Sequence, residues 1–116
     1  ETLFVGPGAA DRYTALTQLF DACVGTSWTE VGSTNRLARR SAPALGDRSV
    51  AYRGTSTEPA TSTTAELTTR SPVQLVLTGD TVIELFSIDT RNTGNPPRLT
   101  EAEFDRIAAR AVTVVG

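Results

Sequence analysis

The chain has 116 residues, a net charge of −2 and 39% apolar residues, a composition typical of one globular domain with its own core. This small charge gives no electrostatic reason to expect nucleic acid as a partner. Histidine is absent and all eleven cationic residues are arginine, which excludes histidine acid–base chemistry and lysine Schiff bases. No apolar run reaches the roughly 18 residues that span a bilayer. We therefore expect one domain over residues 1–116 with no cofactor, no metal site and no membrane contact except through a tether outside the chain.

A short extended segment over residues 1–8 leads into the first predicted helix. Asp11 favours the start of this helix, and Gly25 occupies the position of a C-terminal glycine cap. The spacing between them is that of an amphipathic helix. Its apolar stripe consists of Tyr13, Leu16, Phe20 and Cys23, with Leu19 beside it.

The only cysteine, Cys23, ends this stripe. Three roles are open: a small buried residue, half of a disulfide to a segment or partner outside the chain, or a nucleophile. A nucleophile needs a base to form the thiolate, the chain has no histidine, and the negative end of a helix dipole opposes ionisation. We therefore favour packing, keep the disulfide as the alternative, and assign no catalytic residue.

The middle of the chain shows weak β patterning. Residues 27–31 and 48–53 alternate in the manner of half-buried strands. Residues 35–47 between them form either a strand that ends before Pro43 or a loop. Residues 55–70 are rich in threonine, and Pro59 argues against a central strand, so we expect a loop or an edge strand there. One alternative has residues 63–70 extended.

The clearest element is a β-hairpin around Gly79 and Asp80, a two-residue turn that fixes the register of its strands. The predicted cross-strand pairs are Thr78 with Thr81, Leu77 with Val82, Leu75 with Glu84, and Val73 with Phe86. Alternate residues share a face. One face consists of Val73, Leu75, Leu77, Val82, Glu84 and Phe86, and the other of Gln74, Val76, Thr78, Thr81, Ile83 and Leu85. The first face is more apolar and is expected to meet the helices.

A second helix follows a loop predicted over residues 89–98. Thr100 as N-cap and Glu103 three residues later form a capping box, and Leu99 and Phe104 occupy the staple positions. The predicted buried stripe is Phe104, Ile107, Ala108 and Ala111. Residues 112–116 either continue the helix or form a short strand.

The order of helix, antiparallel strands and helix predicts an α+β fold. We expect an antiparallel β-sheet with the N-terminal and C-terminal helices packed on one of its faces.

Ligand-binding residues are sought among charged side chains near this sheet. Glu84 lies in the middle of the apolar face, where a carboxylate is costly unless it is paired or functional; alternatively, the face is open there and Glu84 lies in water. Arginine clusters bind carboxylates or phosphates by bidentate hydrogen bonds, although they also protect strand edges from pairing. The candidate ligand-binding residues are Glu84, Arg36, Arg39, Arg40 and Arg53.

Several segments in this order resemble actinobacterial extracytoplasmic sensor-like domains, including the PknH-like extracellular domain of mycobacterial receptor kinases and related lipoproteins. The segments are "L-F-D-A-C-V-G-T-S-W", "L-G-D-R-S-V-A-Y-R", the hairpin "V-Q-L-V-L-T-G-D-T-V-I-E-L" and the helix "E-F-D-R-I-A-A-R-A". The resemblance implies a secreted or membrane-tethered α+β domain with a ligand cleft and no enzymatic activity. Arginine in place of lysine is also typical of a GC-rich actinobacterial genome.

These observations lead to three functional hypotheses. The first is a non-enzymatic extracytoplasmic sensor or ligand-binding domain of a lipoprotein or receptor, which holds a small anionic ligand in a cleft between the helices and the sheet face that bears Glu84. The second is a small NTF2-like enzyme with an acid–base carboxylate in a pocket shared by Glu84, Tyr52 and Trp28. The third is a protein–protein interaction module that pairs through residues 55–70.

Overall fold

The computed structural model describes residues 1–87 and 99–115. Six strands form one sheet in the order β1-β6-β5-β4-β3-β2, with every neighbouring pair antiparallel. The elements in chain order are β1 (Thr2–Val5), α1 (Ala9–Cys23), β2 (Ser27–Glu30), β3 (Ser33–Arg40), β4 (Arg48–Glu58), β5 (Leu67–Thr78), β6 (Thr81–Phe86) and α2 (Glu101–Val115). The α+β fold class predicted from the sequence is therefore confirmed.

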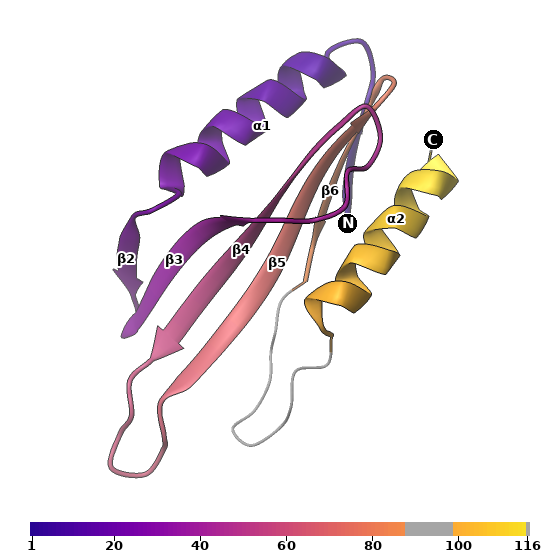
Figure 1. The fold of residues 1–116 in the computed structure, drawn as a ribbon. Coiled ribbons are helices and arrows are strands. Elements are labelled where there is room, and N and C mark those ends of the chain that lie inside the picture. Colours follow the sequence, from indigo (N-terminus) through magenta and orange to yellow (C-terminus); the bar gives the residue numbers. More distant parts are fainter. Residues whose placement is uncertain (88–98, 116) are drawn as a thin grey trace.

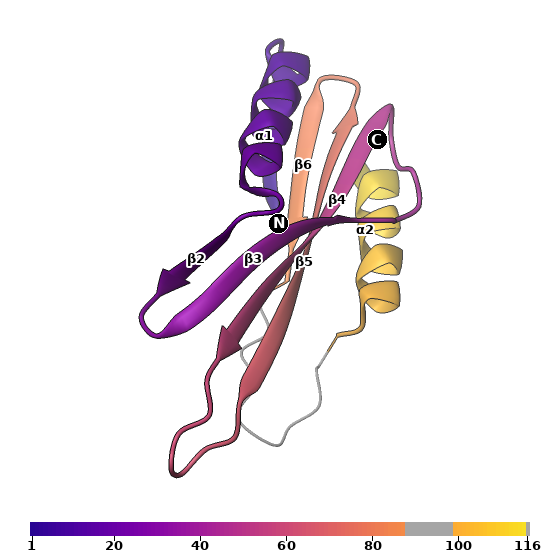
Figure 2. The same ribbon diagram turned by 60° about the vertical axis from the view of Figure 1, so that its left-hand side comes forward.

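The sheet lies between the two helices, as Figures 1 and 2 show. Tyr13 of α1 packs in one core cluster with Leu75 and Leu77 of β5. Phe104 of α2 packs in a second cluster with Val76 of β5. Because successive strand residues point to opposite sides, these clusters lie on opposite faces, called here the α1 face and the α2 face.

The prediction that both helices share one face is therefore wrong. The physical reason is the continuous apolar run in β5, where Leu75, Val76 and Leu77 are 0%, 0% and 7% exposed. A strand with no polar side needs cover on both faces. The second face of the hairpin is thus as much a core surface as the first.

The hairpin register is confirmed in all four predicted pairs, from Thr78 opposite Thr81 to Val73 opposite Phe86. Gly79 has φ +56 in the turn, a conformation that favours glycine. The extended segment at the start of the chain becomes edge strand β1, which pairs with β6. Pairing on both sides places β5 and β6 inside the sheet.

The threonine-rich segment is not an edge strand. Thr55 and Thr57 lie in β4, which pairs with β3 on one side and β5 on the other. Pro59 lies one residue beyond Glu58, the last residue of β4, so it does not interrupt the ladder. The prediction of a loop or edge strand is wrong for residues 55–58, which lie in a central strand, whereas residues 59–66 do connect the two strands. The extended conformation that one alternative gave to residues 63–70 is confirmed from residue 67, where β5 begins.

The helix boundaries follow the sequence signals. Gly25 has φ +81 after the last turn of α1. The backbone N–H of Glu103 donates a 3.1 Å hydrogen bond to the Thr100 hydroxyl, which donates in turn to the Glu103 carboxylate at 3.2 Å. The chain continues as helix to Val115.

Ile107 is 51% exposed, so its assignment to the buried stripe is wrong. The loop predicted over residues 89–98 lies outside the described residues.

No helix within residues 1–87 and 99–115 is long and apolar enough to cross a membrane.

Candidate ligand-binding pocket

The arginines proposed as one ligand-binding cluster are divided between the two faces of the sheet. Alternation along β3 places Arg39 on the α1 face, and Arg36 and Arg40 on the α2 face. Arg53 of β4 is opposite Ala38, which puts it on the α2 face as well. The structure therefore brings Arg40 and Arg53 together and separates them from Arg39.

On the α1 face, Arg39 binds Asp21 of α1. Its Nε and Nη2 atoms donate hydrogen bonds of 2.9 and 2.6 Å to the two carboxylate oxygens. The hydroxyl of Tyr52, which is fully buried, donates to Asp21 Oδ1 at 2.8 Å. The hydrogen bond from Arg39, and after it the one from Tyr52, lowers the pKa of Asp21. The pKa of Tyr52 is raised to about 12, mainly by burial and next by its hydrogen bond to Asp21. The group fastens the C-terminal half of α1 to the sheet.

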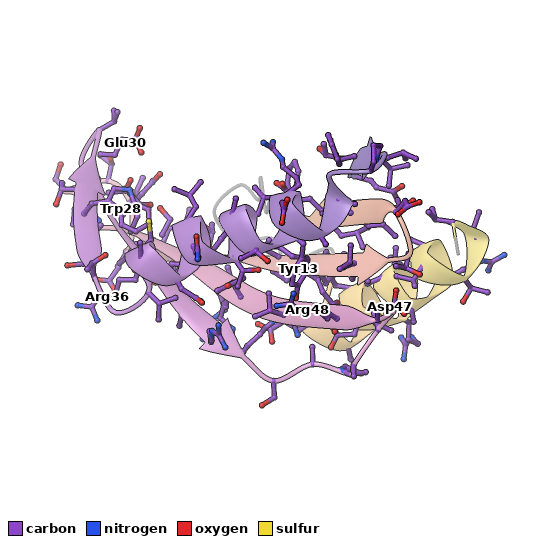
Figure 3. All side chains as sticks on the ribbon, turned by 90° about the horizontal axis from the view of Figure 1, so that it is seen from above. Tyr13, Trp28, Glu30, Arg36, Asp47 and Arg48 are labelled. Atoms are coloured by element: carbon purple, nitrogen blue, oxygen red, sulfur yellow. The ribbon has the colours of Figure 1, made fainter. Side chains whose placement is uncertain are left out.

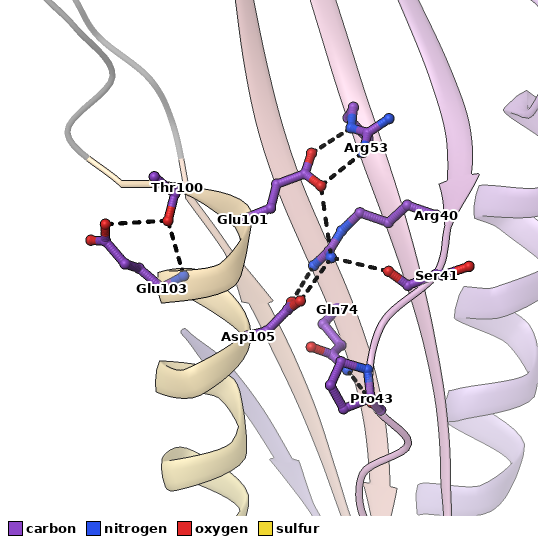
Figure 4. A network of polar contacts seen from close by, with 9 residues as sticks. All are labelled: Arg40, Ser41, Pro43, Arg53, Gln74, Thr100, Glu101, Glu103 and Asp105. Carbon is purple, nitrogen blue, oxygen red and sulfur yellow. Dashed lines mark hydrogen bonds and ion pairs between the residues drawn. The ribbon is translucent and has the colours of Figure 1, made fainter.

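On the α2 face, two arginines bind the first turns of α2 (Figure 4). Arg40 donates two hydrogen bonds to Asp105, at 2.7 and 3.2 Å. Arg53 forms a bidentate pair with Glu101, whose Oε2 also lies 4.0 Å from Arg40 Nη1. The hydrogen bond from Arg53 lowers the pKa of Glu101. Arg40 and Arg53 thus use their guanidinium groups to hold α2.

Glu84 lies apart from all four arginines. It occupies β6 on the α1 face, opposite Leu75 on one side and Thr2 on the other, and is half-buried. Within the described part of the chain, none of its contacts is an ion pair with an arginine. Because Trp28 belongs to β2 at the other end of the strand order, the pocket expected for an NTF2-like enzyme, with Glu84 and Trp28 together, is not formed by the described residues.

A different cavity lies on the α1 face, between the C-terminal half of α1 and strands β2 to β5. We call it the α1-face pocket. Its volume is about 540 Å³, within the range of about 300–1,000 Å³ typical of small-molecule sites. The residues that line it are Leu19, Phe20, Cys23, Trp28, Asn35, Arg36, Leu37, Gly54, Thr55, Ser56 and Ser71.

Neighbouring strands build the floor of this pocket in rows across the sheet. One row runs from Leu37 through Gly54 to Ser71. Gly54 leaves the floor open: a Cβ there would meet only Ser71, at 3.6 and 3.8 Å. The pocket therefore exists because small residues stand where larger side chains would fit.

The next row runs from Trp28 through Asn35 to Ser56. Figure 3 shows Trp28 and Arg36 pointing to opposite sides of the β2–β3 hairpin. Thr55, which is paired with Arg36, belongs to the α2 face with it. The side chains that face the pocket are consequently apolar or neutral.

The walls of the pocket come from α1 and from Trp28. Phe20 stacks on Tyr52 with ring centroids 5.0 Å apart and closes the inner end. Leu19 and Trp28 are 64% and 44% exposed, so they leave apolar surface open along the rim of the cavity. Apolar surface left open beside a cavity is a typical property of ligand sites.

Cys23 also lines this pocket and is exposed. The prediction that it is a buried packing residue is wrong. The chain directly after α1 is held to the sheet, where Val24 bridges Leu37 of β3. Cys23 lies beside this contact and lines the open pocket rather than the core. The thiol is therefore an accessible probe of the site.

Sequence reasoning finds Trp28 and Leu19 as apolar residues but does not find the pocket. The pocket lies where the end of α1 meets strands β2 to β5, and no local sequence pattern predicts where along these strands the helix ends. One signal was available: Gly54 lies inside a strand, where glycine often marks a place at which something approaches the backbone closely.

Comparison with family models, curated proteins and solved structures found no match for this chain. Within the described residues, no group of three or more Cys, Asp or Glu side chains is placed to bind a metal ion. The geometry of the α1-face pocket is therefore the basis for a functional assignment.

Proposed function

We propose that the chain is a non-enzymatic ligand-binding domain whose site is the α1-face pocket. The single observation that carries the proposal is the cavity of about 540 Å³ lined by exposed Leu19 and Trp28. Filling it would remove this apolar surface from water, which stabilises a complex by about 25 cal/mol per Å². The ligand is accordingly a small molecule with an apolar body.

This proposal differs from the expected anionic ligand in one respect. Arg39, Arg40 and Arg53 are occupied by Asp21, Asp105 and Glu101, and their side chains do not line the α1-face pocket. In an extracytoplasmic receptor or lipoprotein, the setting that the sequence resemblance implies, such a domain would act as a sensor of an external apolar molecule.

The chain carries its own reporters for a binding experiment. Trp28 is the only tryptophan and Cys23 the only cysteine, and both line the pocket. A panel of small apolar compounds should change the Trp28 fluorescence. The same compounds should slow the reaction of Cys23 with a thiol reagent. Agreement between the two probes locates the ligand in this pocket.

The matched variants are Gly54→Val and Thr57→Val. Both place a β-branched residue in β4, where it suits a strand, but Gly54 faces the pocket and Thr57 the opposite side. Gly54→Val should abolish both responses, whereas Thr57→Val should retain them. A response that survives Gly54→Val, or no response from any compound, contradicts the proposal.

A further inference from the structure

We propose that the ligand of the α1-face pocket is an amphiphile with a cationic head group, such as an alkylamine or alkylammonium compound. This inference rests on the proposed function and adds the chemistry of the ligand. It follows from how polarity and charge change along the pocket floor, from the inner end to the mouth.

The inner part of the pocket is suited to an apolar tail. The stack of Phe20 on Tyr52 closes it, and the row of Leu37, Gly54 and Ser71 forms its floor. One row farther out, about 6.6 Å along the strands, the amide of Asn35 and the hydroxyl of Ser56 lie beside the ring of Trp28. A ligand that fits this gradient has its tail inward and a polar group near Trp28.

The row beyond carries negative charge. Glu30 lies two residues after Trp28 in β2, and Glu58 lies two residues after Ser56 in β4, so both share the α1 face with the pocket. Both are exposed, and Figure 3 shows Glu30 on the same side of the sheet as Trp28. Two carboxylates therefore flank the mouth.

Close to this mouth, the arginine side chains of the strands lie on the other face of the sheet. Arg36 and Arg70 stand on either side of Thr55 in one row of the α2 face. Arg39, on the α1 face, is already bound by Asp21. Around the mouth, the sheet therefore separates its charges, with carboxylates on the α1 face and the guanidinium groups of Arg36 and Arg70 behind the floor.

This arrangement selects among head groups. An ammonium group near Trp28 would lie within reach of an aromatic face, an attraction known as a cation–π interaction. It would also be attracted by Glu30 and Glu58, which repel a carboxylate or phosphate. Charge complementarity thus favours a cationic ligand, the opposite sign from that expected of an arginine cluster.

Three probes with the same tail test the inference: dodecylamine and dodecanoate, each below the concentration at which it forms micelles, and dodecanol, below its solubility limit. At pH 7 and low ionic strength we expect Trp28 fluorescence to report binding of dodecylamine about tenfold tighter than that of dodecanoate. Dodecanol should bind with intermediate affinity. Added salt should reduce the difference, because it screens exposed charges.

The matched variants neutralise two carboxylates each. Glu30→Gln with Glu58→Gln should reduce the preference for dodecylamine over dodecanol to less than about twofold, since most of the attraction at the mouth is then lost. Asp11→Asn with Asp80→Asn changes the net charge equally at exposed positions in α1 and in the β5–β6 turn, and should leave the preference intact.

The outcomes separate the two proposals. If all three probes bind equally, or if dodecanoate binds most tightly, the pocket is a ligand site but its ligand is not cationic. If the Glu30 and Glu58 variant keeps the full amine preference, the carboxylates do not select the head group and the inference is overturned. If none of the probes binds the unmodified chain, the proposed function fails together with it.

Discussion

Arg40 of β3 and Asp105 of α2 form a two-point ion pair across the α2 face, although 65 residues separate them in the sequence. Only 3% of the Arg40 side chain is exposed. Burying a guanidinium costs several kcal/mol unless a carboxylate compensates it. Arg40 Nε is buried and has no hydrogen-bond partner among the described residues, so Asp105 carries most of the compensation.

Replacing Asp105 should therefore destabilise the domain strongly. We expect Asp105→Ala to lower the free energy of unfolding by about 3 kcal/mol, the cost of an unpaired buried charge, with Glu101 at 4.0 Å as a partial substitute. Urea denaturation measures the change. Asp80→Asn, at an exposed turn position, is the control and should change stability by less than about 0.5 kcal/mol.

The double variant Arg40→Met with Asp105→Leu sharpens this prediction. If the cost comes from an unpaired charge, removing both partners should recover most of the lost stability, because buried ion pairs often contribute little more than apolar side chains of similar volume. An Asp105→Ala variant as stable as the parent chain would show that the pair does not hold α2.

The phenol of Tyr52 should ionise only at strongly alkaline pH. Burial and the hydrogen bond to Asp21 raise its pKa to about 12. Since this folded-state pKa exceeds the ordinary value of 10.0, the stabilisation is complete below pH 10 and is lost as the pH rises toward 12. In Tyr13→Phe, Tyr52 is the only tyrosine, and its phenolate absorbance gives the midpoint.

Adding Asp21→Asn to that variant should bring the Tyr52 midpoint closer to 10, because a carboxylate that accepts the phenol proton favours the neutral form. Burial, the larger cause, should keep it above the ordinary value. A midpoint near 10 in the folded Tyr13→Phe chain contradicts the hydrogen-bonded geometry.

Asp21 should make stability fall in acid. Hydrogen bonds from Arg39 and then Tyr52 lower its pKa from the ordinary 3.8. Because the pKa of Asp21 is lower in the folded state, its carboxylate stabilises the fold at pH values above the unfolded-state pKa. This stabilisation is lost as the pH falls below 3.8 and through the folded-state pKa. The difference in unfolding free energy between the parent chain and Asp21→Asn should be constant near pH 7 and shrink below pH 4. A difference that does not change with pH would rule out the carboxylate as the cause.

Local signals decided which parts of the fold could be predicted from the sequence. The β5–β6 register depends on the two-residue turn at Gly79 and on strand alternation, and both act within a few residues. The capping box at Thr100 is equally local. Alternation could not show which face of the sheet each helix covers. Leu75, Val76 and Leu77 are all apolar, so this part of β5 has no polar side to mark a face turned to water.

The site was less accessible to sequence reasoning because its contacts join distant segments. Arg39 and Arg40 are neighbours in the chain, but strand alternation sends them to Asp21 and Asp105 on opposite faces. Cys23 continues a helical apolar stripe, but at the end of α1 this stripe faces the open α1-face pocket instead of the core. Packing over the whole domain decides where a helix ends relative to the sheet.

Two glycines should respond oppositely to the same substitution. A Cβ at Gly46 would lie 2.6 Å from the Leu77 carbonyl oxygen and 2.8 Å from a Val76 methyl carbon, and Gly46 also has φ +58. Gly46→Ala should therefore destabilise the domain by about 1–3 kcal/mol, through strain and overpacking. At Gly54 a Cβ would make only ordinary contacts with Ser71.

Gly54→Ala should accordingly leave stability unchanged or raise it by up to about 1 kcal/mol, since alanine loses less conformational entropy in a strand. It should also weaken ligand binding, because the added methyl group occupies the floor of the α1-face pocket. Thermal or urea unfolding of both variants, with ligand titration by Trp28 fluorescence, tests this contrast. Equal destabilisation by the two substitutions would mean that the floor at Gly54 is packed rather than open, and a pocket packed at that point would have no room for a ligand.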